Sequence, residues 1–200
     1  LHTHLPKLSW QYGDDHEGDS KVLILPTGPA DTFESCGLMF VNAIHQAQER
    51  FWLASPYFIP DGKIRSALVL AALKGVDVRI LLPVRPDHKM VFYARQDFYQ
   101  EMQEAGVKFY LYRDGFLHQK VFIVDNDVCA VGTANLDNRS FRLNFELTGL
   151  VKDKEFISVL EKQLLEDFDH SELLAPFRLG ERPICCLLYT SPSPRDKTVS

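Results

Sequence analysis

The chain has 200 residues, of which 46% are hydrophobic and 24% charged, and this suits one soluble domain with a core of ordinary size. Its net charge of −5 disfavours a nucleic-acid partner, which would call for a basic surface, although a local basic pocket is compatible with it. No apolar run reaches the ~20 residues that span a bilayer, and no signal peptide is recognisable. The four cysteines lack metal-ligand spacing, so reduced thiols are the simplest interpretation.

The two ends of the chain differ from its middle in composition. Residues 1–20 are rich in polar turn formers and show little periodicity, so we expect a linker that follows a missing N-terminal half. From about residue 181 the periodicity is lost again, and two Ser-Pro pairs predict a disordered and non-native tail over 181–200. The chain also lacks an initial Met. We therefore interpret it as a fragment of a longer polypeptide, with one domain over 21–180.

Strands and helices alternate through the first half of this domain. Short apolar runs bounded by Gly or Pro predict four strands, at 21–26, 51–57, 76–82 and 107–112. Apolar stripes between them predict three helices, beginning at Asp31 or Thr32, at Asp61 and at Asp87. Such an alternation predicts parallel strands joined by right-handed crossovers, with helices over the faces of the sheet.

The second half of the domain has a different order of elements. Val121–Val124 and Val128–Val131 flank a polar turn and predict an antiparallel hairpin. A further strand is expected over 144–151, and a closing helix over 154–168 has an apolar stripe that includes Phe156. The expected fold class is α/β, with a mixed, largely parallel β-sheet flanked by helices.

Polar side chains that can take part in a reaction gather around the hairpin. His118, Lys120 and Asp125 form the pattern H-x-K-x4-D, and Thr133 and Asn135 follow the next strand. Because side chains alternate along a strand, His118 and Lys120 share one face. An imidazole can attack phosphorus or pass a proton, and an ammonium neutralises the non-bridging oxygens of a phosphate. Asn135 can add an amide donor and Thr133 a hydroxyl, so the sequence predicts a phosphate site.

This motif, together with the run GTANLDNRSFRLNFE from Gly132 to Glu146, resembles the phospholipase D superfamily and its HKD motif. Within the superfamily it is most similar to bacterial cardiolipin synthases, in the C-terminal of their two HKD domains, and the resemblance covers roughly 22–183. It implies a phospholipase D-like fold and an exchange in which two phosphatidylglycerol molecules give cardiolipin and glycerol through a phosphohistidine. It also implies a reaction with no cofactor and no metal.

The resemblance further implies roles for the candidate residues. Family members usually place the nucleophile in their N-terminal motif, so His118 would be the general acid, although the nucleophile role stays open. Lys120, Thr133 and Asn135 would bind the substrate phosphate. Glu146 would bond the other imidazole nitrogen and raise the pKa of the ring. Asp125 belongs to the catalytic motif, but because a carboxylate repels phosphate we prefer a structural role for it at the hairpin turn.

One HKD motif supplies only one histidine of a two-histidine site. The second motif would come from the same parent chain or from a homodimer partner. The expected substrate is an anionic phospholipid at the membrane surface, on the cytoplasmic face of the cell membrane, and no nucleic acid is expected.

Two alternative functions stay open. One is a phosphodiesterase or nuclease that uses water as acceptor, and the other is a non-catalytic half that only completes its partner. Transferase and hydrolase share every catalytic residue, so the sequence leaves the acceptor open.

Overall fold

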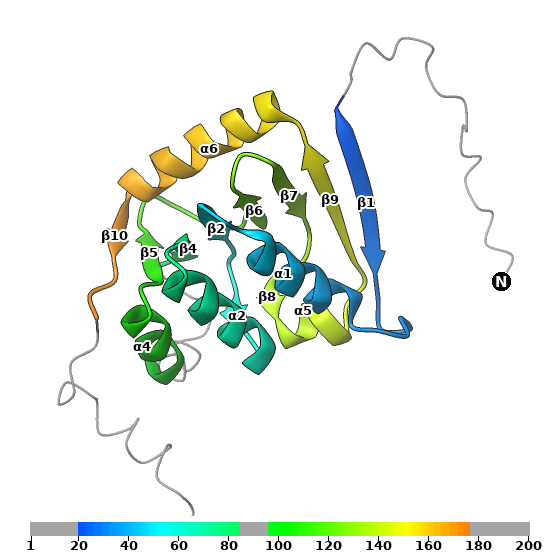
Figure 1. Ribbon diagram of the computed structural model, residues 1–200, viewed down its shortest axis with the longest axis horizontal. Helices are drawn as coiled ribbons and strands as arrows, with labels where there is room; N and C mark the ends of the chain where they lie inside the picture. Colours follow the sequence, from blue (N-terminus) through cyan, green and yellow to red (C-terminus); the bar gives the residue numbers. More distant parts are fainter. Residues whose placement is uncertain (1–19, 85–95, 177–200) are drawn as a thin grey trace, which may run out of the picture.

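The computed structural model describes residues 20–84 and 96–176 (Figure 1). The strands are β1 (Lys21–Thr27), β2 (Arg50–Ala54), β3 (Phe58–Ile59), β4 (Asp77–Pro83), β5 (Lys108–Tyr112), β6 (Val121–Val124), β7 (Val128–Gly132), β8 (Leu136–Asp137), β9 (Glu146–Lys152) and β10 (Ser171–Leu173). The helices are α1 (Ser35–Gln46), α2 (Gly62–Leu73), α4 (Gln96–Glu104), α5 (Asn138–Arg142) and α6 (Lys154–Asp169). Within the described ranges, none of these helices has the length and apolar character needed to cross a membrane.

Eight strands form one sheet, in the order β1-β9-β7-β6-β2-β4-β5-β10, and β3 pairs with β8 in a small second sheet. The predicted α/β class and the mixed sheet are confirmed, as is the antiparallel β6–β7 hairpin. The expectation of a largely parallel sheet is wrong, because among the described strands of the large sheet only β2–β4 and β4–β5 are parallel pairs.

The error arises at β1, the first strand. It does not lie beside β2, as the first strand of a βαβ unit would, but pairs antiparallel with β9 at the far edge of the sheet. The β6–β7 hairpin and β9 separate it from β2. The chain therefore reaches β2 through α1, which lies across the face formed by these inserted strands (Figure 1).

Both faces of the sheet are covered at its centre, as the alternating side chains of β2 show. Phe51 and Leu53 pack with α1 and α2, whereas Trp52 and Ala54 pack with α6. Trp52 meets Phe168 of α6 edge to face, with ring centroids 5.5 Å apart. Burying a large apolar side chain stabilises a fold by about 1.5–3 kcal/mol. The two buried layers therefore make the centre of the sheet a rigid base for the strand ends.

Three of the described helices, α2, α5 and α6, begin at aspartate caps, and the cap of α2 was predicted. The carboxylate of Asp61 accepts from the Ile64 N–H at 3.0 Å and starts α2, as expected. The carboxylate of Asp153 accepts from the Phe156 N–H at 2.8 Å and starts α6. Phe156 was expected on the inward stripe but is 44% exposed, whereas Ile157 is 2% exposed. At the start of α6, the side chain that packs into the core is therefore that of Ile157, one residue later than predicted.

The start of α1 lies later than predicted. The helix begins at Ser35, and Asp31 instead accepts from the Gly28 N–H at 3.2 Å in a turn before it. The helix expected from Asp87 is described only from Gln96 onward as α4, and its earlier residues lie outside the described ranges. The linker predicted over 1–20 and the tail predicted over 181–200 also fall outside these ranges, apart from Ser20.

Candidate active site

His118 and Lys120 lie in an extended segment that leads into β6, just before the strand begins. We call residues 117–120 the HKD segment. It continues the line of β6, because the Gly132 N–H donates to the Lys120 carbonyl at 3.1 Å, one step beyond the β6–β7 ladder. Lys120 Nζ donates to the His118 carbonyl at 2.7 Å. The Lys120 ammonium is therefore held at the backbone of His118, and its pairing with the imidazole stays a prediction.

The imidazole of His118 lies at the surface. Leu117, next to it in the chain, is buried at 5% exposure, whereas His118 is exposed. The ring stacks on Phe116, with centroids 5.2 Å apart and an interplanar angle of 15°. This leaves the ring nitrogens accessible to a substrate or to a second protein half.

Glu146 lies on the same side of the sheet, at the start of β9, and is only 8% exposed. Its carboxylate accepts from the Thr133 hydroxyl and from Asn144 Nδ2, the latter at 3.1 Å. The Thr133 hydroxyl in turn accepts from the Leu147 N–H at 3.0 Å. Among the described residues no hydrogen bond joins Glu146 to His118, so the expected contact with the imidazole is not formed in this structure. Both carboxylate oxygens are held by other partners.

The charge of Glu146 acts on Lys120 instead. Burial lowers the pKa of the Lys120 ammonium, and the Glu146 carboxylate opposes this by raising it. Glu146 therefore helps to keep the Lys120 ammonium charged. Burial raises the pKa of the Cys36 thiol to about 11, and the Glu146 carboxylate adds to this shift. A thiol with this pKa is not a nucleophile at neutral pH.

We expect replacement of Glu146 by Gln to shift the alkaline limb of the pH profile to lower pH. The amide keeps an acceptor for Thr133 but removes the charge that raises the Lys120 pKa, so Lys120 loses its proton at lower pH. Turnover of a two-motif protein that contains this chain, measured against pH, tests this. The control is Asn144→Ser, which removes a hydrogen bond to Glu146 and leaves its charge. Superimposable profiles for Glu146→Gln and the wild type would contradict the assigned role.

Gly132 lets β7 and β9 approach closely where Thr133 meets Glu146. A Cβ at Gly132 would lie 2.6 Å from the Leu147 carbonyl oxygen and 2.9 Å from the Thr148 Cα, and these backbone atoms cannot move aside freely. We expect Gly132→Ala to lower the free energy of unfolding by about 1–3 kcal/mol.

Denaturant unfolding of Gly132→Ala and of Gly149→Ala measures this effect. Gly149 is also a strand glycine, but a Cβ there would meet its nearest atoms at 3.6 Å, an ordinary contact distance. Equal unfolding midpoints for the two variants would show that the close approach at Gly132 does not affect the free energy of unfolding.

Asn135 is held by its backbone, and its side chain has an unused acceptor. The Asn135 N–H donates to the Ser140 hydroxyl at 3.1 Å, and the Ser140 N–H donates to Asp137 at 2.8 Å. Asn135 Oδ1 is buried and has no hydrogen-bond partner in the described part of the chain. A buried polar atom without a partner costs about 1–3 kcal/mol. Asp137 and Ser140 were not singled out from the sequence, although their spacing is that of a helix cap.

Asp125 lies at the opposite end of β6 from Lys120. Its carboxylate accepts from the backbone N–H groups of Gln48, Glu49 and Arg50 at 3.0, 2.8 and 2.8 Å. Its own backbone has a φ of 50°, which Asp tolerates better than most residues. These bonds favour the structural role, although the carboxylate holds the loop before β2 and the first residue of β2, not the hairpin turn as expected. The inclusion of Asp125 among the catalytic residues stays a prediction.

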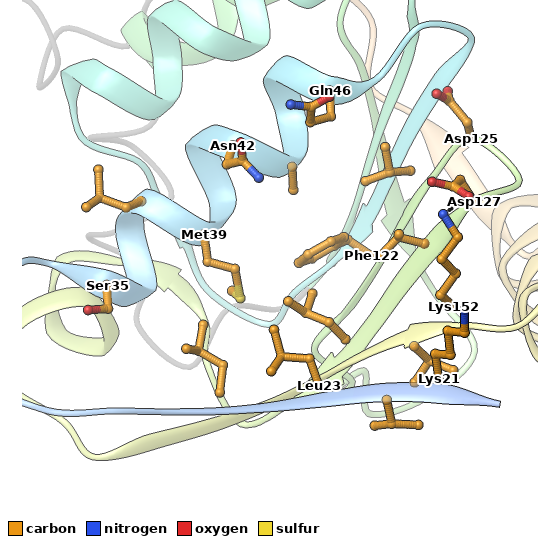
Figure 2. A pocket seen from close by; sticks show the side chains of 18 residues that line it. Lys21, Leu23, Ser35, Met39, Asn42, Gln46, Phe122, Asp125, Asp127 and Lys152 are labelled. Atoms are coloured by element: carbon orange, nitrogen blue, oxygen red, sulfur yellow. Dashed lines mark ion pairs between the residues drawn. The ribbon is translucent and has the colours of Figure 1, made fainter.

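A cavity of about 810 Å³ lies between α1 and the strands β1, β9, β7 and β6. Figure 2 shows Asp125, Asp127 and Lys152 at one end of it and Ser35 at the other. Asp127 and Lys152 form an ion pair of 2.7 Å there. None of His118, Lys120, Thr133, Asn135 and Glu146 lines this cavity. This cavity is therefore separate from the candidate phosphate-binding residues.

Comparison with known proteins shows the family to which the chain belongs. The family described as "Cardiolipin synthase, PLD-like domain" matches residues 40–168. Cardiolipin synthase A of Pseudomonas putida is 56% identical over 147 residues, which cover 74% of this chain and 31% of that protein. Cardiolipin synthase A of Pseudomonas syringae is 56% identical over 146 residues, which cover 73% and 30%. The chain thus spans under a third of the curated relatives that it matches.

Solved structures of low sequence identity share the fold. Nuc of Salmonella typhimurium, a phospholipase D family member, aligns with a TM-score of 0.65 and 18% identity, over 78% of this chain and 99% of Nuc. Phosphatidylserine synthase of Haemophilus influenzae aligns with a TM-score of 0.63 and 20% identity, over 78% of this chain and 40% of the synthase. The family match covers more than half of this chain. The chain therefore belongs to the phospholipase D-like family of cardiolipin synthase type.

Proposed function

We propose that this chain supplies one catalytic half of a cardiolipin synthase, a phosphatidyltransferase that joins two phosphatidylglycerol molecules. The observation that carries the proposal is the Lys120 ammonium, which bonds the backbone carbonyl of the exposed His118 at the strand end where Glu146 supports the charge of Lys120. Relatives more than 50% identical bear the same activity in their names.

The reaction has two steps, and His118 takes part in both. In the first step a histidine nitrogen attacks the phosphorus of phosphatidylglycerol, the P–O bond to glycerol breaks, and a second histidine protonates the leaving oxygen. In the second step a hydroxyl of another phosphatidylglycerol attacks phosphorus, the P–N bond breaks, and the hydroxyl proton returns to the second histidine. Lys120 stabilises the charge that builds up on the non-bridging oxygens in both transition states.

The two-histidine reaction requires a second motif, since His118 is the single histidine of the HKD segment. By family analogy His118 is the general acid and the nucleophile belongs to the other half. That half comes from the same parent chain or from a second copy of this one, related by a two-fold axis. In either arrangement the exposed imidazole of His118 faces the partner half.

Exposed apolar side chains near the site suit a lipid substrate. Phe116, which stacks on His118, is 79% exposed, and Leu143 and Phe145 on the approach to β9 are 67% and 83% exposed. Large exposed apolar groups around a polar site mark a contact with an apolar partner. They support our proposal that the enzyme works on phospholipid at the membrane surface, while the anionic headgroup and the cytoplasmic face rest on the family resemblance.

The proposed function is tested with phosphatidylglycerol vesicles and a two-motif protein that contains this chain. We expect cardiolipin and glycerol in equal amounts, and unchanged rates with a chelator, because imidazole, ammonium and amide groups are poor ligands for hard cations. Phosphatidic acid as the main product would mean that water is the acceptor. Absence of any product from a folded, vesicle-bound protein would reduce the chain to a non-catalytic half.

A further inference from the structure

A buried carboxylate lies directly behind the HKD segment. Asp167, in the last turn of α6, is 7% exposed. Its Oδ2 accepts from Gln119 Nε2 at 2.6 Å and its Oδ1 accepts from Gln163 Nε2 at 3.2 Å. Among the described residues, no Lys, Arg or His pairs with it. All the side-chain donors to this carboxylate are neutral amides.

General stability does not explain an aspartate at this position. Carboxylates are almost never buried without a charged partner, because the loss of hydration is costly. The negative end of the helix dipole also lies at the C-terminal turn, where an anion is unfavourable. The neighbouring inward residues of α6, Leu164 and Phe168, are apolar core residues. An apolar side chain at position 167 would fit the same face, so the carboxylate needs a specific reason.

Gln119 supplies that reason, since it stands between His118 and Lys120 in the chain. In an extended segment alternate side chains point to opposite sides, so Gln119 reaches α6 while its two neighbours face away from that helix. The strand ladder holds this segment only weakly: its link to β7 is the bond from the Gly132 N–H to the Lys120 carbonyl. Leu117 packs into the apolar cluster shared with α6. The bond from Gln119 to Asp167 is the polar anchor of the same segment.

We propose that Asp167, acting through Gln119, is a positioning residue that fixes His118 and Lys120 at the geometry which binds the phosphate. Asp167 does not touch the substrate, and its role rests on the function proposed above. The bond from Gln119 Nε2 to Asp167 Oδ2 is short, at 2.6 Å, which suits an anchor at a single point. Misplacement of a catalytic group by about 1 Å can lower the rate by ~10²-fold, so an anchor that fixes the position of His118 and Lys120 raises the rate.

The test compares Gln119→Leu with Gln163→Leu in the full 200-residue chain. Each variant removes one amide N–H bond to the same carboxylate, but only Gln119 belongs to the HKD segment. Inorganic phosphate is titrated into each protein and followed by NMR. The ring-proton shifts of His118 are read at the same time, because they report its stack on Phe116.

We expect Gln119→Leu to weaken phosphate binding by ~10-fold or more and to move the His118 ring shifts. Gln163→Leu should change the affinity by less than about twofold and leave those shifts in place, even if both variants lose similar stability. Equal effects of the two variants on affinity and on the ring shifts would overturn the proposal and leave Asp167 a structural residue.

A second pair of variants covers the case in which Gln119→Leu does not fold. Asp167→Asn keeps an oxygen that can accept from Gln119, whereas Asp167→Leu does not. We expect phosphate affinity and His118 ring shifts close to the wild type in the first and a loss in the second. Loss of both readouts in Asp167→Asn, with the fold intact, would contradict a role through this hydrogen bond.

The outcome also separates this proposal from the proposed function. If the wild-type chain binds no phosphate, the phosphate site itself fails. The positioning role is then judged on the His118 ring shifts alone: a change in Gln119→Leu and none in Gln163→Leu supports it, and no difference overturns it.

Discussion

Replacing His118 with alanine is expected to lower turnover by ~10²-fold or more while the free energy of unfolding stays within about 0.5 kcal/mol of the wild type. The imidazole is exposed and stacks only on Phe116, which is itself 79% exposed, so its removal leaves no cavity in the core. The reaction, in contrast, loses either its nucleophile or its acid. Cardiolipin formation and denaturant unfolding, measured on the same preparation of a two-motif protein containing this chain, test both halves of this expectation.

A matched control is His45→Ala. His45 is also an exposed histidine, but it lies in the last turn of α1 and belongs to no motif. Its replacement should leave turnover unchanged. If His118→Ala retained near-normal turnover, or if His45→Ala lost as much, the assignment of the chemistry to the HKD segment would be wrong.

Replacing Asp125 with alanine is expected to have the opposite profile: a loss of about 2–3 kcal/mol in stability, with turnover per folded molecule unchanged. Its carboxylate accepts from the N–H groups of Gln48, Glu49 and Arg50, and bonds to a charged acceptor contribute more than neutral ones. Without it these three donors at the start of β2 lose their protein partner. Denaturant unfolding gives the stability, and amide hydrogen exchange at 48–50 localises the effect.

Asp127→Ala is the control from the same turn. Asp127 pairs with Lys152 at 2.7 Å, but both side chains are more than half exposed, and such pairs contribute little. Its replacement should change stability by less than about 0.5 kcal/mol. A loss equal to that of Asp125→Ala would show that charge in the turn matters, not the bonds to the backbone. A loss of turnover in folded Asp125→Ala would place Asp125 among the catalytic residues.

The parts of the site that depend on local geometry could be predicted from the sequence. The hairpin that follows the HKD segment forms as expected, and Lys120 bonds the backbone carbonyl of His118 two residues away. The structural role of Asp125 followed from electrostatics, because a carboxylate beside a phosphate is unfavourable. The Asp61 cap of α2 is likewise local, since the cap and the N–H that it accepts from are three residues apart.

The parts that depend on contacts distant in sequence could not be predicted. A strand has the same side-chain period in parallel and antiparallel pairs, so nothing within β1 shows that it lies beside β9. Glu146 was assigned to His118, but Thr133 and Asn144 hold its carboxylate, and its charge acts on Lys120. Asp167 appears in the sequence as one acidic residue of a helix, and its bond to Gln119 becomes visible only in the fold.

The claim that this chain carries half of a phosphatidyltransferase site is tested most directly by a transplant. Residues 20–176 replace the matching part of Pseudomonas putida cardiolipin synthase A, with and without His118→Ala, and cardiolipin formed from phosphatidylglycerol vesicles is measured. We predict cardiolipin formation by the first protein and a loss of ~10²-fold or more in the second, with equal folding. Equal cardiolipin formation by the two proteins, or none by a folded first protein, would contradict the claim.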